Sequence, residues 1–202
     1  MNYFTLKGEG VYEKIIERSR FITYSFCVTT QEQAKEYLDK IRKKHSDATH
    51  NCYAYKLRDG ACKFSDDGEP SGTAGAPIFE GINTSKLTDV LVVVTRYFGG
   101  IKLGAGGLTR AYFNCAKEAL DNAEQVECIE CDNYLAFLTY EEFNACGNFF
   151  NSPQVKVKQK EFSCQVKVEF CVKKGERVEE RLASILNKKP PISRLHTSFE
   201  VF

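Results

Sequence analysis

Three segments between residues 49 and 112 hold the residue types that could bind an anion, accept a proton or coordinate a metal ion. They read THN at 49–51, SDDGEPSGTAG at 65–75 and RYFGGIKLGAGGLTRAY at 96–112. The third segment has five glycines in nine positions, directly after the apolar run at 90–94. Glycine costs conformational entropy there, so the pattern predicts unusual φ and ψ angles or a close approach of the backbone to another group.

The glycine segment also predicts an anion site at the start of a helix. It leads from the end of a strand into a first helical turn, with Lys102 and Arg110 nearby. Unpaired N–H groups and the helix dipole attract anions at such a position. We therefore expect the three segments to form one polar surface site. Its candidate partner- or anion-binding residues are His50, Asn51, Asp66, Asp67, Glu69, Ser71, Thr73, Arg96, Tyr97, Gly99, Gly100, Lys102, Gly104, Gly107 and Arg110.

The familiar enzymatic templates do not fit these segments. The stretch GGIKLGAGG lacks the Gly-Lys-Ser/Thr ending of a Walker A loop, and its glycines do not follow the G-x-G-x-x-G spacing. Asp66, Asp67 and Glu69 could bind Mg²⁺, although three acids on one turn usually form a solvated loop. His50 could act as a base toward a hydroxyl of the second segment, but no spacing pairs them. We therefore assign no catalytic residue, metal ligand or cofactor.

The composition is that of a globular protein without a strong charge. The 202 residues are 43% hydrophobic and 27% charged, with a formal net charge of +1, which does not by itself indicate a nucleic acid or a membrane. We see no apolar signal-peptide core and no apolar run as long as a membrane span. The nine cysteines are scattered, so we expect reduced thiols in a cytoplasmic protein that has no membrane partner.

The N-terminal part alternates between strand and helix patterns. Strands are expected at 20–28, 52–57, 63–65 and 89–97. A helix is expected where apolar residues recur from Ala34 to Ile41, with Thr30 and Gln33 as a capping box. A second helix should begin near Pro77, and a third should follow the glycines through about Asn122.

The C-terminal part predicts the element order βαββαβ. Strands are expected at 132–140, 155–160, 164–172 and 195–201, and helices at 141–150 and 178–186. This is the ferredoxin-like order, with two helices on one face of an antiparallel sheet. Alternation then places a row of lysines on the open face, where they could hold an RNA backbone or could simply keep the surface soluble. These lysines are Lys156, Lys158, Lys160 and Lys167.

Four stretches of the sequence together resemble the IMPACT family, in particular its bacterial YigZ-type members. They are ERSRFI at 17–22, DATHN at 47–51, SDDGEPSGTAG at 65–75 and VVVTRYFGGIKLGAGGLTRAY at 92–112. The resemblance implies an α+β protein with two domains. Residues 1–127 would be similar to the second domain of ribosomal protein S5, and residues 132–202 to the ferredoxin-like domain V of elongation factor G.

The resemblance also implies a function in translation. The family's eukaryotic members regulate translation as binding proteins, and the two related folds both work at the ribosome. We therefore expect a non-enzymatic regulatory protein that binds RNA, the ribosome or a translation-related protein. The alternative is a nucleotide- or phosphate-binding enzyme that uses the glycine loop and an acidic Mg²⁺ loop. We further expect that Arg96→Ala with Arg110→Ala removes binding and leaves thermal stability nearly intact.

Overall fold

The computed structural model describes residues 2–202, which separate into two compact units. One unit is Tyr3–Val126, and the other is Glu127–Phe202 together with Asn2. Both units combine helices with an antiparallel sheet, so the expected mixed α/β architecture is present.

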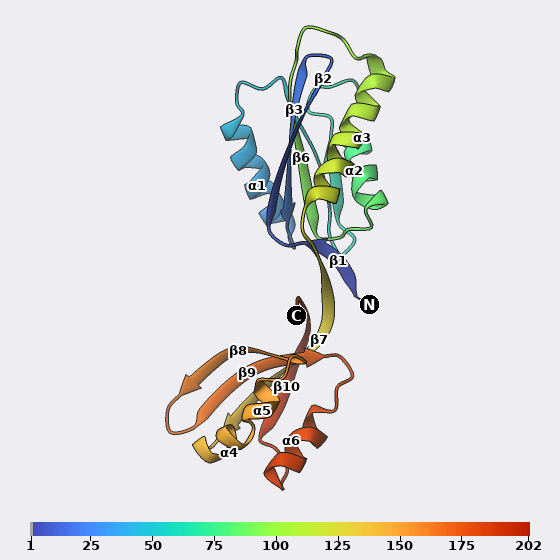
Figure 1. The fold of residues 1–202 in the computed structure, drawn as a ribbon. Coiled ribbons are helices and arrows are strands. Elements are labelled where there is room, and N and C mark those ends of the chain that lie inside the picture. The colour runs from blue at the N-terminus through green and yellow to red at the C-terminus, as the bar shows by residue number, and fades with distance from the viewer. Residues whose placement is uncertain (1) are drawn as a thin grey trace. The chain divides into compact units, whose positions relative to one another are not determined.

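The N-terminal unit is built around a five-stranded antiparallel sheet in the order β2-β3-β6-β4-β5. Helix α1 lies on one face, and α2 and α3 lie on the other (Figure 1). The strands are β2 (Glu9–Ile16), β3 (Ser19–Cys27), β4 (His50–Lys56), β5 (Cys62–Ser65) and β6 (Val90–Tyr97), and a short strand, β1 (Tyr3–Leu6), precedes them. The helices are α1 (Gln31–Lys44), α2 (Gly75–Thr84) and α3 (Gly104–Asn122).

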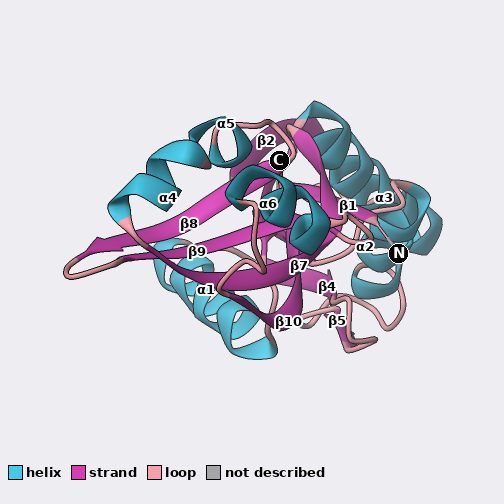
Figure 2. Cartoon of the chain, turned by 90° about the horizontal axis from the view of Figure 1, so that it is seen from below, coloured by secondary structure: helices cyan, strands magenta, loops and turns pink. Residues whose placement is uncertain are grey.

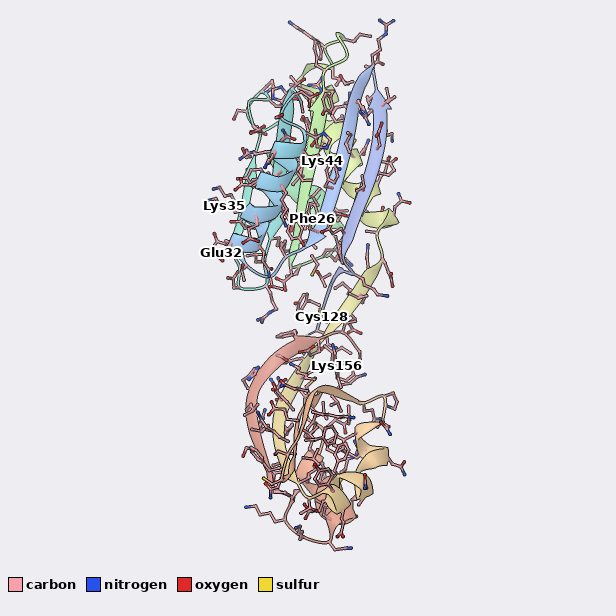
Figure 3. All side chains as sticks on the ribbon, turned by 90° about the vertical axis from the view of Figure 1, so that its left-hand side faces the viewer. Phe26, Glu32, Lys35, Lys44, Cys128 and Lys156 are labelled. Carbon is pink, nitrogen blue, oxygen red and sulfur yellow. The ribbon has the colours of Figure 1, made fainter. Side chains whose placement is uncertain are left out.

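Strand β6 is apolar from Val90 to Val94 because helices cover both faces of the sheet. Val92 and Val94 enter the core under α2 and α3, whereas Leu91 and Val93 enter a second core under α1. Figure 3 shows α1 over this second face, where the Phe26 ring stacks on Tyr37 of the helix at a centroid distance of 4.3 Å. The end of β6 and the start of β4 are therefore held from both sides, which positions the side chains described below.

The expected strands and helices of this unit are present, and β1 and β2 are two strands that we did not predict. Helix α1 begins at the expected cap, where Thr30 Oγ1 accepts the Gln33 N–H at 3.2 Å. The second half of the capping box differs from the expectation. The Gln33 side chain accepts the N–H of Thr29, one residue earlier, at 2.8 Å.

The C-terminal unit has the expected order of strands and helices, with the first helix divided into two short pieces. Its strands pair antiparallel in the order β8-β9-β7-β10, and the helices lie on one face of this sheet (Figure 2). The strands are β7 (Gln125–Leu138), β8 (Val155–Phe162), β9 (Val166–Lys173) and β10 (Ile192–Glu200). The helices are α4 (Tyr140–Ala145), α5 (Gly147–Phe150) and α6 (Val178–Leu186).

The core of the C-terminal unit lies between its helices and its sheet. Phe149, Phe150 and Leu182 from the helices pack on Val168 and Phe170 of β9. Strand β7 begins seven residues before the predicted strand at 132, at Gln125, so it is one continuous strand across the boundary between the units. No helix within residues 2–202 combines the length and the apolar character that crossing a membrane requires.

None of the nine cysteines, all within residues 2–202, forms a disulfide, and their exposure differs widely. Cys62 on β5 and Cys164 between β8 and β9 are exposed, whereas Cys27 is partly buried and the other six are buried. Burial raises the pKa of Cys52 and of Cys115 to about 12 in each case. Because the thiolate is the reactive form, these two buried thiols are chemically inert at neutral pH.

Candidate functional site

The three sequence segments meet in the N-terminal unit around a cleft of about 420 Å³. Strand β4 contributes His50 at its start, and β6 contributes Arg96 near its end. These two residues are direct partners in the β4–β6 register, which explains why segments 46 residues apart in the chain lie side by side. The cleft is lined by Thr49, His50, Glu69, Pro70, Arg96, Phe98, Lys102, Leu103, Gly104, Ala105 and Leu108.

A buried ion pair forms the floor of the site. Arg96 Nη1 donates to Glu69 Oε1 at 2.6 Å, and the two side chains are only 5% and 3% exposed. Arg96 Nη2 also donates to Ser19 Oγ at 3.2 Å, and the guanidinium lies 5.5 Å from the ring centroids of Phe21 and of Phe98. Its Nε is buried without a hydrogen-bond partner in the described chain. Arg96 is therefore neutralised inside the protein and is not the exposed cation that we expected.

The same carboxylate oxygen accepts a second hydrogen bond from the interior. Tyr112 of α3 donates its hydroxyl to Glu69 Oε1 at 2.8 Å, and the Cys52 thiol lies 3.4 Å from that hydroxyl oxygen. Burial raises the pKa of Tyr112 far above its ordinary value, and the neighbouring Cys52 and Glu69 raise it further. The hydroxyl therefore remains a proton donor to Glu69 at any physiological pH.

His50 is held in one tautomer over the cleft. Its Nδ1 lies 2.8 Å from the backbone carbonyl oxygen of Asp67, which can only accept, so Nδ1 carries the proton. The other nitrogen, Nε2, lies 3.8 Å from Glu69 Oε2. In the neutral ring both of these atoms are acceptors, and neither receives a hydrogen bond from residues 2–202.

The two aspartates of the acidic loop stabilise the loop itself. Asp66 accepts the N–H groups of Gly72, Ala74 and Gly75 at 2.8–3.0 Å, so its carboxylate sits on the start of α2. Burial would raise the pKa of Asp66, but these three backbone hydrogen bonds together hold it below its usual value.

Asp67 is used in a similar way. Asp67 Oδ2 accepts the Asn51 N–H at 2.7 Å, and Oδ1 accepts from Arg42 Nη2 at 2.8 Å. Nowhere in residues 2–202 do three or more His, Cys, Asp or Glu side chains gather in a group that could hold a metal ion.

The reason why glycine is needed differs from one position of the segment to the next. A Cβ on Gly99 would lie 2.0 Å from the carbonyl oxygen of Arg18, so only glycine fits against that turn. Gly100 and Gly104 have φ angles of +84° and +70°, which L side chains rarely adopt. A Cβ on Gly107 would meet Leu103 Cβ at 3.1 Å. The segment therefore combines one close backbone approach with two left-handed positions.

Helix α3 starts without a side-chain cap. Its N-cap residue is Leu103, so no side chain accepts the first N–H groups of the helix. Lys102 and Arg110 are exposed beside this end, and no ion pair in residues 2–202 involves either of them. The guanidinium of Arg110 reaches back to the first turn, since a Cβ on Gly106 would lie 3.8 Å from its Nη1. Lys102 and Arg110 also line a second hollow of about 580 Å³, together with Glu17 and Leu103.

The remaining candidates lie beside the cleft or away from it. Thr73 donates to the Pro70 carbonyl at 2.6 Å, and Ser71 is exposed. Asn51 accepts from the buried Thr95 hydroxyl at 2.8 Å. Tyr97 lies at the α1 face of the sheet, where its hydroxyl meets His45 Nδ1 and Asp47 at 2.8 and 3.1 Å. These residues support the strands and loops, and the structure does not place Tyr97 on the cleft.

The lysine row of the C-terminal unit is altered by a β-bulge. Register shifts between Val157 and Gln159, so Lys160 comes to lie opposite Val168, on the side of the helices. Its ammonium lies 5.4 Å from the Phe143 ring centroid. The expectation that Lys160 faces outward was wrong for this reason.

The other three lysines of the row are ion-paired. Lys156 and Lys158 both contact Glu200, at 3.0 and 2.5 Å, and Lys167 contacts Glu161 at 3.1 Å. Figure 3 marks Lys156 on β8. This face is therefore less basic than its lysine content indicates, and its role in RNA binding stays a prediction.

Several residues of the site could not be identified from the sequence. Tyr112 and Cys52 fit apolar patterns, and nothing in those patterns shows that the tyrosine hydroxyl reaches a carboxylate 43 residues away. Ser19 and Phe98 were also missed. Phe98 was within reach of sequence reasoning, because it is an aromatic side chain between a strand end and two glycines.

Comparison with known proteins identifies a family for the N-terminal unit. A family model described as the Impact N-terminal domain matches residues 17–120. The IMPACT family member YvyE of Bacillus subtilis is 52% identical over 128 residues, which are 62% of this chain and 59% of that protein. An IMPACT family member of Haemophilus influenzae is 35% identical over 191 residues, 93% of this chain and 92% of that protein.

A solved structure shares the fold over almost the full length. It is the crystal structure of a hypothetical protein, with a TM-score of 0.67 and 25% sequence identity. The match covers 96% of this chain and 98% of that chain.

Proposed function

The chain belongs to the IMPACT family, and on this basis we propose that it is a non-enzymatic regulatory protein, linked to translation, that binds RNA. The RNA would be free or part of the ribosome, and the protein would act in the cytoplasm. The proposal includes the two fold relationships that the resemblance implies. Residues 1–127 would be an S5 domain 2-like domain, and residues 132–202 a ferredoxin-like domain similar to domain V of elongation factor G. The β8-β9-β7-β10 order with helices on one face supports the second relationship.

The uncapped start of α3 is the observation that carries the proposal. Its free N–H groups lie beside Lys102 and Arg110, two exposed cations without ion pairs in the described chain. A phosphate at a helix start gains about 0.3–1 kcal/mol from the dipole, and more from an arginine that contacts it directly. Contacts of this size bind a single phosphate weakly and a polymer of phosphates well, because many such contacts add.

The geometry gives less support to the enzymatic alternative. A Mg²⁺-dependent nucleotide enzyme needs carboxylate oxygens that face the bound phosphates. Asp66 instead accepts three N–H groups at the start of α2, and Asp67 binds Asn51 and Arg42. Both aspartates thus maintain the loop, and the cations remain as the phosphate-facing groups.

RNA binding and its salt dependence test the proposal. We expect the purified chain to bind a fluorescent single-stranded RNA, with affinity that falls steeply as salt rises. Removing one cation that neutralises a phosphate should reduce the slope of log K against log salt by about 0.7. Lys102→Ala with Arg110→Ala should therefore weaken binding and reduce that slope by roughly 1.4 if each cation neutralises one phosphate.

Lys43→Ala is the matched control, since this lysine is exposed on α1 in the same unit and away from the cleft. It should leave the slope unchanged. Co-purification at low and at high salt gives the complementary result. RNA or ribosomal subunits that dissociate at high salt support the proposal, whereas a protein partner retained without RNA contradicts it.

A further inference from the structure

We propose that the cleft binds one guanine nucleotide of the RNA, with its phosphate at the start of α3 and its base edge on Glu69 and His50. This inference rests on the proposed function and adds a base preference to it. The cleft volume of about 420 Å³ falls within the range of roughly 300–1,000 Å³ that is typical of small-ligand sites.

Glu69 has one carboxylate oxygen, Oε2, that no group within the described chain uses as a hydrogen-bond acceptor. Glu69 Oε1 accepts from both Arg96 and Tyr112, whereas Oε2 has no hydrogen-bond donor among residues 2–202. The Glu69 side chain is 3% exposed and lines the cleft. Oε2 is not among the fully buried polar atoms without a partner, so it opens on the cleft, where water or a ligand can donate to it.

The tautomer of His50 supplies a second hydrogen-bond acceptor. Because Nδ1 donates to the Asp67 carbonyl, Nε2 of the neutral ring presents a lone pair, 3.8 Å from Glu69 Oε2. With the ring neutral, two neighbouring acceptors therefore line the cleft. A ligand that presents two adjacent hydrogen-bond donors can satisfy both of them, one donor to each acceptor.

Among the four RNA bases, guanine alone offers such a pair on its Watson–Crick edge. Its N1–H and its N2 amino group are neighbouring donors, whereas adenine, cytosine and uracil each carry one donor group on that edge, next to an acceptor. A site built from acceptors rejects such bases, because an acceptor of the base would face an acceptor of the protein. The chemistry of the cleft therefore favours guanine.

The same cleft also has a surface on which the base can stack and a position for the phosphate of the nucleotide. Phe98 lines the same cleft with its side chain 46% exposed, so a base can stack on its ring. Gly104 and Ala105, at the uncapped start of α3, line it too, together with Lys102. One cleft thus holds an aromatic surface, a pair of acceptors and an anion site.

Titration of the ¹⁵N-labelled full chain at pH 8 tests the inference, with backbone amide shifts as the readout. The probes are guanosine, inosine and adenosine 5′-monophosphates and inorganic phosphate. Inosine monophosphate differs from the guanine nucleotide only by the N2 amino group, so it removes one donor. We expect the guanine nucleotide to bind about tenfold or more tightly than the other two nucleotides. Inorganic phosphate should shift the amides of Gly104, Ala105 and Gly106 and leave those around His50 unchanged.

Two variants separate the base site from the phosphate site. Glu69→Gln keeps an acceptor toward Arg96 and Tyr112 and replaces Oε2 with an amide donor, so the guanine preference should disappear while the phosphate response remains. If this variant does not fold, Phe98→Ala serves instead and should weaken all three nucleotides. Phe64→Ala is its control, because Phe64 is 49% exposed in the same unit and lies outside the cleft.

Equal affinity for the three nucleotides, or shifts confined to another surface, would overturn the inference. RNA binding without any guanine preference would refute the base site and leave the proposed function standing. Guanine-selective binding of the mononucleotide without RNA binding would support the cleft assignment and contradict the RNA role. Failure of both RNA and mononucleotides to bind would contradict both.

Discussion

At the scale of single residues, the site depends on how Glu69 is held. Its carboxylate is buried, paired with Arg96 and hydrogen-bonded to Tyr112. Removing one member of a buried pair leaves an uncompensated charge in the protein interior, which costs far more than the pair itself contributes. The pair is therefore a structural element that presents one carboxylate oxygen to the cleft.

This arrangement predicts that Arg96→Ala destabilises the protein. We expect the free energy of unfolding to fall by about 3–5 kcal/mol, because Glu69 would stay buried without its partner. Arg110→Ala is the comparison, since this exposed arginine has no ion pair in the described chain, and it should change stability by less than about 0.5 kcal/mol. Urea denaturation of both variants measures the difference. Equal stabilities would show that the pair does not hold the site together and would restore the expectation that Arg96 is dispensable for folding.

The residue types of the site could be predicted from the sequence, but their states could not. The residue types in the three segments identified His50, Glu69, Arg96 and Lys102 as candidates. The burial of Arg96 follows from its contacts with Glu69 and Ser19, which are 27 and 77 residues away. Such long-range pairing leaves no local pattern, so a buried arginine and an exposed one look the same in the sequence.

At the scale of elements, the glycine segment contains positions with opposite tolerance for a side chain. Gly99 lies against the Arg18 carbonyl, whereas a Cβ on Gly106 would meet only the end of the Arg110 side chain, at 3.8 Å. Gly106 is also within α3, where glycine is the poorer helix former.

Alanine substitution at these two glycines should therefore act in opposite directions. Gly99→Ala should lower the melting temperature strongly or prevent folding, because backbone would have to move. Gly106→Ala should raise the free energy of unfolding by about 0.4–1 kcal/mol. Thermal unfolding followed by circular dichroism checks both, and a stable Gly99→Ala protein would rule out the close approach.

The lowered pKa of Asp66 predicts that the stability contributed at the start of α2 depends on pH. Its pKa is lowered in the folded state, so its contribution is fully present above the ordinary carboxyl pKa near 4 and is lost as pH falls through the lower folded value. Asp66→Asn removes the charge and can keep only one of the two carboxylate acceptors, so it should cost about 1 kcal/mol at pH 7, the order of one hydrogen bond. The difference between variant and wild type should shrink as pH falls below about 4, as denaturation at several pH values would show. A difference independent of pH would mean that the charge of Asp66 does not contribute.

Most elements followed from local patterns, and those that did not were set by pairing with distant strands. The helices and the central strands have strong periodicity. Strand β2 was missed because it lies at the edge of its sheet, where Val11 and Ile15 are exposed among charged residues. The bulge in β8 was missed because only its register with β9 reveals it. Whether a strand lies at an edge or contains a bulge depends on its pairing with the neighbouring strand, and local sequence patterns do not show that pairing.

At the scale of the whole molecule, each unit has its own hydrophobic core. The N-terminal unit has two cores on the faces of its sheet, and the C-terminal unit has one. A segment with its own core can fold alone.

We expect a fragment that ends at Val126 to fold and to keep the proposed RNA-binding site. Its ¹H–¹⁵N spectrum should be dispersed, with the amides around the cleft at the positions seen in the full chain. The complementary fragment from Glu127 serves as the comparison for RNA binding. An unfolded N-terminal fragment would mean that β7 must continue beyond Val126 to stabilise the unit.

The uneven exposure of the cysteines allows two dyes to be attached to this chain and the distance between them to be measured. Cys62 belongs to the N-terminal unit and Cys164 to the C-terminal unit, and both thiols are exposed, whereas the other seven are partly or fully buried. A maleimide dye should therefore label two positions per native chain, one in each unit, without any engineered cysteine. Energy transfer between a donor and an acceptor dye at these positions would then report the distance between the units, and whether added RNA changes that distance, in the natural sequence.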